Sequence, residues 1–404
     1  MKKLICILLA SVIFVAATPS VFGCSSQNRD EILKLYLPGE YIDESIFETF
    51  ETWYEEQTGN KVTVKPETFE AVENIQLAVE GSKADYDLLC PSDYMIEYLI
   101  SKNLLLEYDK SVIDVAEDGL FKEEYIESTR EFDPQLKYAV PYMYGTLGLV
   151  YDITKTEKHV TSWESLFGNE FAGKRSVKDS VRDAYAAACI YNAREELAGL
   201  TGQQQKDKIQ SIFEDTSETT VNNAEATLKA VKSGGAIWDV DNVKFNMAAN
   251  RSNVAVALMW SCDAGYVMND YEEDGKTLPG NRNLWYVVPE EGGNVYIDAF
   301  VISKYAKNVT AANYFLKFLC TTDVAVQNSE YAGCISPVAT AYDELYETYM
   351  EDEDGMFEGT PEGWKEMFME TMFPSEETLN RCGVMKDFGN GKTAVTRMWA
   401  NIQA

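Results

Sequence analysis

The sequence predicts an α/β protein with two lobes, and three observations lead to this prediction. Apolar strand-like runs alternate with segments of helical periodicity, as in folds built on largely parallel sheets. About 380 residues remain after an N-terminal export signal, more than one compact core normally holds. Aromatic and acidic residues recur where predicted strands end, which is where sheets of this class bind ligands.

The first residues have the pattern of a secretory signal peptide over 1–23. Lys2 and Lys3 precede an apolar stretch over 4–17, and a region of mostly small residues leads to Cys24. This apolar run is shorter than the roughly 20 residues that a membrane-spanning helix needs. We therefore expect an exported protein that is soluble once the signal is removed.

Cys24 is a candidate lipidation site. The stretch Val21-Phe22-Gly23-Cys24 resembles the bacterial lipobox, in which the cysteine is lipidated and becomes the mature N-terminus, although Phe22 departs from the usual small residue. The resemblance implies a lipidated N-terminus and polar tether over 24–30. Cleavage without lipidation, leaving Cys24 as a thiol, is the alternative.

Strand-like and helix-like segments alternate in the first part of the chain. Ile46, Phe50, Trp53 and Tyr54 repeat at helical spacing, and Gly59 follows as a helix end. The predicted strands are 32–37, 61–65 and 86–90, and the predicted helices are 43–58, 67–79 and a third that opens at 91–93.

The alternation resumes after residue 141. Thr161 to Glu164 has the pattern of a capping box at the start of a short helix. Strands are predicted at 147–151, 254–260 and 295–302, helices at 179–191, 310–319 and 323–331, and an acidic surface loop at 351–355.

The strong excess of acidic residues limits the kinds of partner that this chain can bind. Acidic residues number 66 against 35 basic ones, a formal charge of −31, and removal of Lys2 and Lys3 makes it −33. Nucleic-acid binding is excluded, because it needs basic residues to replace phosphate counterions. An anionic membrane surface also repels the chain, so we expect membrane contact only through the lipid. Clefts in such a protein attract cations.

The residue inventory argues against most enzyme classes. His159 is the only histidine, which excludes most hydrolase triads and multi-histidine metal sites. No CxxC, HExxH, P-loop or strand-linked GxGxxG pattern is present, so we predict no metal and no cofactor. A glycoside hydrolase working through carboxylates alone is the enzyme alternative, although no acidic pair stands out.

The cysteines leave the disulfide pattern open. Six remain after the signal peptide and Cys24 are set aside, and six cysteines allow 15 pairings. They are Cys90, Cys189, Cys262, Cys320, Cys334 and Cys382.

Four predicted strand exits each pair an aromatic ring with a carboxylate. One such pair means little in a chain with 12% aromatic residues, but four at strand exits are a stronger signal. They lie at 38–41, 92–94, 260–263 and 296–298.

Rings combined with carboxylates suit a polyamine, a flexible apolar rod that carries ammonium groups. Carboxylates hold the ammonium groups through charge-assisted hydrogen bonds of about 1.5–3 kcal/mol each. Aromatic faces cover the methylenes, and a cation facing a ring adds about 0.5–2 kcal/mol. Acidic groups alone would suit Ca²⁺ or Mg²⁺, and aromatic groups alone would suit a sugar.

At these residues the chain resembles the periplasmic spermidine/putrescine-binding protein family from about Leu33 to the C-terminus. A looser match covers 333–337, and the chain beyond about 346 is longer than the usual tail of the family. The clearest matches are 86–94, 140–146, 160–163 and 288–293, the last leading to 296–298.

The resemblance implies a type II periplasmic binding protein with a mixed, mostly parallel sheet in each lobe. Strand crossovers are expected near Tyr142, Tyr296 and Tyr342. The N-terminal lobe would comprise 31–142 plus 297–342, and the C-terminal lobe 143–296 plus 343–404. The lobes would close by a hinge around a polyamine and present it to an ABC permease. We expect a non-enzymatic monomer, in the periplasm or on the outer face of the cell membrane.

Candidate ligand-binding residues follow from the resemblance and from the strand exits. Trp260 would stack on the ligand and Asp298 would anchor an amine, while Asp93 is a carboxylate particular to this chain. Packing in the core is the alternative role of Trp260. The candidates are Glu40, Tyr41, Ser92, Asp93, Tyr94, Asp183, Trp260, Tyr296 and Asp298.

Several positions depart from the family pattern. Pro38 and Gly39 stand where the family has an aromatic residue and a threonine, and Ser180, with Asp179 beside it, stands where the family has an acid. Cys334 and Met385 align with a late tyrosine and a late glutamine. These four, Asp179, Ser180, Cys334 and Met385, are weaker candidates. Another solute, such as a sugar, an amino acid or a metal chelate, is the alternative ligand.

Overall fold

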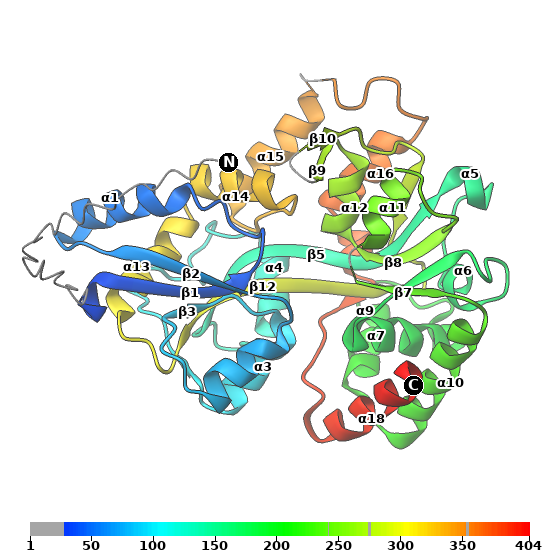
Figure 1. The fold of residues 1–404 in the computed structure, drawn as a ribbon, viewed down its shortest axis with the longest axis horizontal. Helices are drawn as coiled ribbons and strands as arrows, with labels where there is room; N and C mark the ends of the chain where they lie inside the picture. Colours follow the sequence, from blue (N-terminus) through cyan, green and yellow to red (C-terminus); the bar gives the residue numbers. More distant parts are fainter. Residues whose placement is uncertain (1–27, 241, 274–275, 353–354) are drawn as a thin grey trace, which may run out of the picture.

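The computed structural model describes residues 28–240, 242–273, 276–352 and 355–404. Two halves of the molecule lie side by side, joined by the long strands β5 (Ala139–Asp152) and β12 (Gly293–Ser303) that run through its middle (Figure 1). This is the two-lobed α/β fold that the sequence predicts. The predicted signal peptide, Cys24 and the tether up to residue 27 lie outside the described residues.

The first half is built on three parallel strands with β1 in the middle, between β2 and β3. Helices α1 and α13 pack on one face of these strands, and α3 lies on the other (Figure 1). Its elements are η1 (Arg29–Glu31), β1 (Ile32–Pro38), α1 (Ile46–Thr58), β2 (Thr63–Phe69), α2 (Glu73–Gln76), η2 (Leu77–Gly81), β3 (Leu88–Leu89), α3 (Asp93–Ser101), β4 (Leu105–Leu106), α4 (Glu123–Arg130), α13 (Val309–Leu319), α14 (Thr322–Ala332) and α15 (Ala339–Glu351).

The second half has β6 as its central strand, parallel to both β7 and β8. Its strands are β6 (Arg175–Lys178), β7 (Ile237–Asp239), β8 (Val256–Trp260), β9 (Tyr271–Glu273), β10 (Lys276–Leu278), β11 (Leu284–Val287) and β13 (Cys382–Gly383). Its helices are α5 (Ile153–Thr156), α6 (Glu164–Phe167), α7 (Val181–Asn192), α8 (Arg194–Leu197), α9 (Gly202–Glu214), α10 (Glu218–Ser233), α11 (Asn242–Ala248), α12 (Ser261–Met268), α16 (Trp364–Met372), α17 (Glu376–Leu379), η3 (Gly389–Gly391) and α18 (Lys392–Gln403).

One sheet continues through both halves. Its strand order is β2-β1-β3-β12-β5-β8-β6-β7. Strands β1, β2 and β3 are parallel to one another, as are β6, β7 and β8, whereas β12 is antiparallel to β3 and β5, and β5 is antiparallel to β8. The two antiparallel connectors place the carboxyl ends of β3, β6 and β8 near the middle of the molecule, where the candidate site lies.

Helix α1 shows how the sequence pattern becomes packing. Ile46, Phe50 and Tyr54 are spaced four residues apart and are buried. Phe50 meets Phe315 of α13 edge to face, with ring centroids 4.8 Å apart. Gly59 ends the helix with a φ of 72°, a left-handed conformation that glycine adopts without strain. The predicted helix is confirmed, although it begins at Ile46 rather than near residue 43.

The predicted helix 67–79 is wrong in its first part. Strand β2 continues to Phe69 because its backbone pairs with β1 up to Pro38. Only the short α2 and the π-type turn η2 follow. Pairing with a neighbouring strand outweighs local helix preference here.

The predicted capping box at the start of α6 is also wrong. Trp163 is the N-cap and makes no capping bond through its side chain. The hydroxyl of Ser162 instead donates to the carboxylate of Glu291, while it accepts a hydrogen bond from the Glu164 N–H at 3.1 Å. The helix start is therefore fixed by a tertiary contact.

The chain near Tyr342 is helical, which corrects the expectation of a third crossover strand. Tyr342 lies within α15, and its ring packs against Tyr144 of β5 at a centroid distance of 6.3 Å. Tyr144 in turn stacks on Tyr125 at 3.8 Å. Aromatic packing holds this segment of the chain in place as a helix. A strand here would need a neighbouring strand with unpaired backbone groups.

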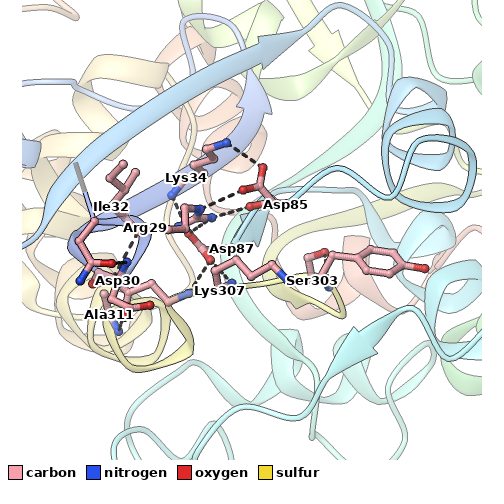
Figure 2. A network of polar contacts seen from close by, with 12 residues as sticks. Arg29, Asp30, Ile32, Lys34, Asp85, Asp87, Ser303, Lys307 and Ala311 are labelled. Atoms are coloured by element: carbon pink, nitrogen blue, oxygen red, sulfur yellow. Dashed lines mark hydrogen bonds and ion pairs between the residues drawn. The ribbon is translucent and has the colours of Figure 1, made fainter. Parts of the chain in front are cut away.

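A buried carboxylate fastens the start of the described chain to the first half (Figure 2). Asp87 accepts hydrogen bonds from the N–H groups of Lys34, Lys307 and Asn308 at 2.7–2.8 Å. Arg29 pairs with Asp87 at 2.9 Å and with Asp85 at 3.0 Å. The network joins η1, β1 and the turn before α13.

The described residues contain neither a membrane-spanning helix nor a cluster of metal-binding side chains. No helix among them is both long and apolar enough to cross a membrane. No group of three or more potential metal ligands occurs among them either.

Candidate functional site

Asp298 lies at an irregularity in β12. The register against β5 shifts between Asp298, which pairs with Met143, and Ala299, which pairs with Pro141. Such a bulge redirects a side chain relative to a regular strand. The hydroxyl of Tyr41 donates to Asp298 Oδ2 at 2.7 Å, whereas the buried Oδ1 has no hydrogen-bond partner. Burial raises the pKa of Asp298, although hydrogen bonds from Ser92 and Tyr41 oppose this rise.

Ser92, Asp93 and Tyr94 follow β3 at the start of α3, as the strand-exit rule predicts. Ser92 forms an isolated β-bridge with Asp298. Asp93 is 1% exposed and its Oδ2 has no hydrogen-bond partner. Burial raises the pKa of Asp93 to about 8, and the nearby charge of Asp298 adds to this rise.

Aromatic rings surround these carboxyl groups. Tyr41 meets Tyr142 edge to face at 5.7 Å, and Tyr296 lies 6.2 Å from Trp260. Tyr296 lies over Gly145 of β5, where a Cβ atom would stand 2.3 Å from the tyrosine oxygen. Gly145 therefore leaves the room that the Tyr296 ring occupies.

Asp183 is the carboxyl group that the second half of the molecule contributes to this site. It lies in the first turn of α7, is 5% exposed, and its Oδ2 has no hydrogen-bond partner. Burial raises its pKa, whereas Lys178, Ser180 and Trp260 oppose the rise. The adjacent Arg182 lies 3.6 Å from the ring centroid of Tyr94, so α7 contacts α3 of the other half.

Lys178, Asp263 and Lys244 form a cluster that the sequence analysis did not single out. Lys178 Nζ lies 3.3 Å from the ring centroid of Trp260 and 3.3 Å from Asp263 Oδ2. Lys244 Nζ lies 2.5 Å from the other oxygen of Asp263. Burial alone would raise the pKa of Asp263, but the two lysine charges lower it.

The sequence contains only part of the pattern that would identify Lys178 as a site residue. It ends β6 and stands just before α7, so the strand-exit rule applies to it. The segment Arg175-Ser-Val-Lys178 has one apolar residue in four, too little for the pattern to indicate a strand.

Of Glu40, Asp179, Ser180 and Met385, only Ser180 contacts a carboxyl residue of the site, Asp183. Glu40 lies in an exposed turn. Burial raises the pKa of Tyr331, and the charge of Glu40 adds to this rise. Asp179 is exposed and accepts a hydrogen bond from Gln403 of α18. Ser180 accepts a hydrogen bond from the Asp183 N–H as the N-cap of α7. Met385 is buried beside Arg182 and Phe388.

Cys334 forms a disulfide with Cys262, a pairing that the sequence left open. The hydroxyl of Tyr296 donates to Cys262 Sγ at 3.1 Å, so this disulfide borders the site through an aromatic ring. The free cysteines of the described chain are Cys90, Cys189, Cys320 and Cys382.

With this geometry in place, comparison with known proteins assigns the family. The model of the bacterial extracellular solute-binding proteins matches residues 49–358. The chain belongs to this family. Members of this family bind solutes and are not enzymes. This chain is therefore the solute-binding component of an ABC transporter. The alternative of a glycoside hydrolase is wrong.

Two relatives resemble the chain over nearly its whole length. The spermidine/putrescine-binding periplasmic protein of Escherichia coli is 24% identical, over 96% of this chain and 97% of the relative. The crystal structure of the spermidine/putrescine transporter substrate-binding protein of Streptococcus pneumoniae is 26% identical, with a TM-score of 0.68 over 92% and 98%. The family resemblance that the sequence predicts is confirmed.

The same fold serves a different ligand elsewhere. The binding protein MotA of A. tumefaciens B6, solved in complex with glucopine, has a TM-score of 0.64 at 15% identity, over 92% of this chain and 99% of that one. This likeness shows the fold alone. The ligand of the present chain therefore has to be argued from its own residues.

Proposed function

We propose that this chain captures a polyamine, such as putrescine or spermidine, between its lobes and presents it to the membrane permease of an ABC importer. The observation that carries the proposal is the pair Asp93 and Asp298, two carboxyl groups that each keep one buried oxygen without a hydrogen-bond partner. An ammonium group supplies both the missing donors and the opposite charge.

The surrounding rings suit the rest of such a ligand. Tyr41, Trp260 and Tyr296 are partly exposed although they lie among buried strands. Their apolar faces match a methylene chain, and they exclude water from the ion pairs, which strengthens them. The names of the Escherichia coli and Streptococcus pneumoniae relatives support the same ligand class.

The proposed site lies between the lobes. In our proposal residues 31–142 plus 297–342 and residues 143–296 plus 343–404 move as two bodies, and closure brings their faces onto the ligand. The proposed ligand-binding residues are Tyr41, Ser92, Asp93, Tyr94, Asp183, Trp260, Tyr296 and Asp298.

We place this receptor outside the cytoplasmic membrane, as its family implies. A lipid on Cys24 would hold it there, and metabolic labelling with palmitate tests that anchor.

Substitution of Asp298 tests the function. Asp298→Asn removes a charge but keeps the shape, so we expect polyamine affinity to fall more than roughly tenfold, the loss of one charge-assisted contact. Isothermal titration with putrescine, spermidine, neutral sugars and amino acids measures this effect and tests the alternative ligands.

Asp179→Asn is the matched control, since Asp179 is an exposed acid at the start of α7 and lies away from the cluster. We expect this variant to bind as the wild type does. Wild-type protein that gives no heat with any polyamine, or equal losses in both variants, would contradict the proposed site.

A further inference from the structure

Lys178 places a positive charge on the ring that is expected to stack on the ligand. Its Nζ lies 3.3 Å from the centroid of Trp260, and its side chain is only 2% exposed. An ammonium group over an indole face is a favourable cation–π arrangement, most favourable when water is excluded. The protein itself therefore occupies one face of Trp260 with a cation.

The charges around Trp260 do not favour a second ammonium group there. Asp263 is shared between Lys178 and Lys244, at 3.3 Å and 2.5 Å. Arg182 lies nearby on the ring of Tyr94. An added cation would meet these positive groups, and the carboxylate nearest to Lys178 is already paired.

Three other carboxyl groups of the site carry no such pairing. Among the described residues, no ion pair involves Asp93, Asp183 or Asp298, and each has an oxygen without a hydrogen-bond partner. Ammonium groups of a ligand can be held at these carboxylates without displacing a protein cation. Asp93 and Asp298 lie in the first half, whereas Asp183 of the second half lies close enough to Lys178 and Trp260 for both to act on its carboxyl group.

The Lys178 side chain has the chemistry of a polyamine end. Its four methylenes and terminal ammonium are the same aminobutyl unit that putrescine and spermidine contain. We propose that Lys178 supplies from within the protein the ammonium that a longer polyamine would place on Trp260, so that the site accepts a short diamine and rejects a triamine. This inference rests on the proposed polyamine function.

Substitution of Lys178 by methionine tests the inference. Methionine keeps an unbranched side chain of similar girth but carries no charge, and Lys244 still pairs with Asp263 in the variant. We expect the wild type to bind putrescine at least tenfold more tightly than spermidine. In Lys178→Met we expect that ratio to shift towards spermidine by a factor of ten or more, measured by titration calorimetry.

Lys244→Met is the matched control, because it removes the other lysine on Asp263 and leaves Lys178 over Trp260. We expect it to keep the wild-type preference. Circular dichroism checks that both variants fold, and the ratio of two affinities measured on one sample does not depend on the active fraction.

The outcomes separate the two hypotheses. Equal affinity of the wild type for both amines, or an unchanged ratio in Lys178→Met, would overturn the role of Lys178 while leaving a polyamine receptor in place. Absence of binding by either amine to any variant would overturn the polyamine function itself. A shift in Lys244→Met equal to that in Lys178→Met would also overturn the assignment, because general charge would then explain it.

Discussion

Asp93 and Asp298 illustrate how position changes the chemistry of a carboxyl group. Asp93 is almost fully buried, and the charge of Asp298 acts on it from β12, so its pKa rises to about 8. Asp93 consequently holds a proton at neutral pH in the ligand-free protein. An ammonium group bound nearby would stabilise the ionised form and release this proton.

The raised pKa of Asp93 predicts a pH-dependent stability. Between pH 3.8, the ordinary aspartate pKa, and pH 8 the folded chain keeps a proton that the unfolded chain loses. The free energy of unfolding therefore falls as pH rises through this range, by an upper limit of roughly 6 kcal/mol. Asp93→Asn cannot ionise, so we expect urea denaturation at pH 5 and pH 8 to show a much smaller fall in this variant.

Asp109→Asn is the control for this experiment. Asp109 is exposed, and hydrogen bonds from Ser111 lower its pKa, so it stays ionised between pH 5 and pH 8. We expect this variant to retain the wild-type slope. A slope in Asp93→Asn equal to that of the wild type would mean that Asp93 is ionised in the folded protein throughout.

At the scale of elements, Asp87 joins two segments that are distant from it and from each other in sequence. Its carboxylate holds β1 through Lys34 and the turn before α13 through Lys307 and Asn308 (Figure 2). Asp87→Ala would leave these buried N–H groups and Arg29 without their acceptor. We expect a loss of about 3–5 kcal/mol in the free energy of unfolding, measured by denaturant titration.

Asp85→Ala separates burial from charge in that network. Asp85 also pairs with Arg29 and with Lys34, but its side chain is 41% exposed. An exposed pair contributes about 1 kcal/mol or less, so the effect is expected to be small. Similar losses in both variants would show that burial is not what makes Asp87 important.

Strand ends were the most informative elements of the sequence. The exits of β3 and β8 bring Ser92, Asp93 and Trp260 into one region, because apolar runs identified these strands correctly. Asp298 joins them from the middle of β12, so the predicted strand exit at 296–298 is wrong although its residues reach the site. The sequence pattern did not reveal strand β6, because the charged residue Arg175 occupies a buried position in it. Its guanidinium donates to the carbonyl groups of Leu166 and Gly168, and no sequence pattern reveals such partners.

Other parts of the site depend on contacts between distant segments. The Cys262–Cys334 pairing follows from the meeting of α12 with the turn after α14, and composition alone leaves many pairings open. Glu40 was a reasonable candidate beside Tyr41, but the backbone turns there with a φ of 55° and the glutamate lies in the exposed part of the turn. Neighbours in sequence need not share a site.

At the scale of the whole molecule, Arg182 links the two lobes. Its guanidinium lies over Tyr94 of α3 and also 3.9 Å from the ring centroid of Phe388. Close by, Lys386 approaches Glu131 of the first lobe at 3.3 Å. In the hinge motion that we propose, these contacts would break as the lobes open, so we expect them to favour the closed arrangement.

Arg182→Met should favour opening of the ligand-free receptor. Loss of a cation–π contact of about 0.5–2 kcal/mol shifts the equilibrium between closed and open forms roughly 2- to 30-fold towards the open form. Small-angle X-ray scattering should show a larger radius of gyration for the variant. Arg194→Met is the control, since Arg194 makes the same kind of contact with Tyr191 within one lobe. Identical scattering curves from Arg182→Met and wild type would refute the linking role.

The ribbon formed by β5 and β12 has an entropic consequence for binding. Because β12 stays hydrogen-bonded to β5 from Asn294 to Val301, ordered chain joins the lobes at these two connections (Figure 1). Ordering one free backbone residue costs about 1–2 kcal/mol. A closure that only twists an ordered ribbon avoids most of that cost, so more of the contact free energy between solute and protein remains as affinity.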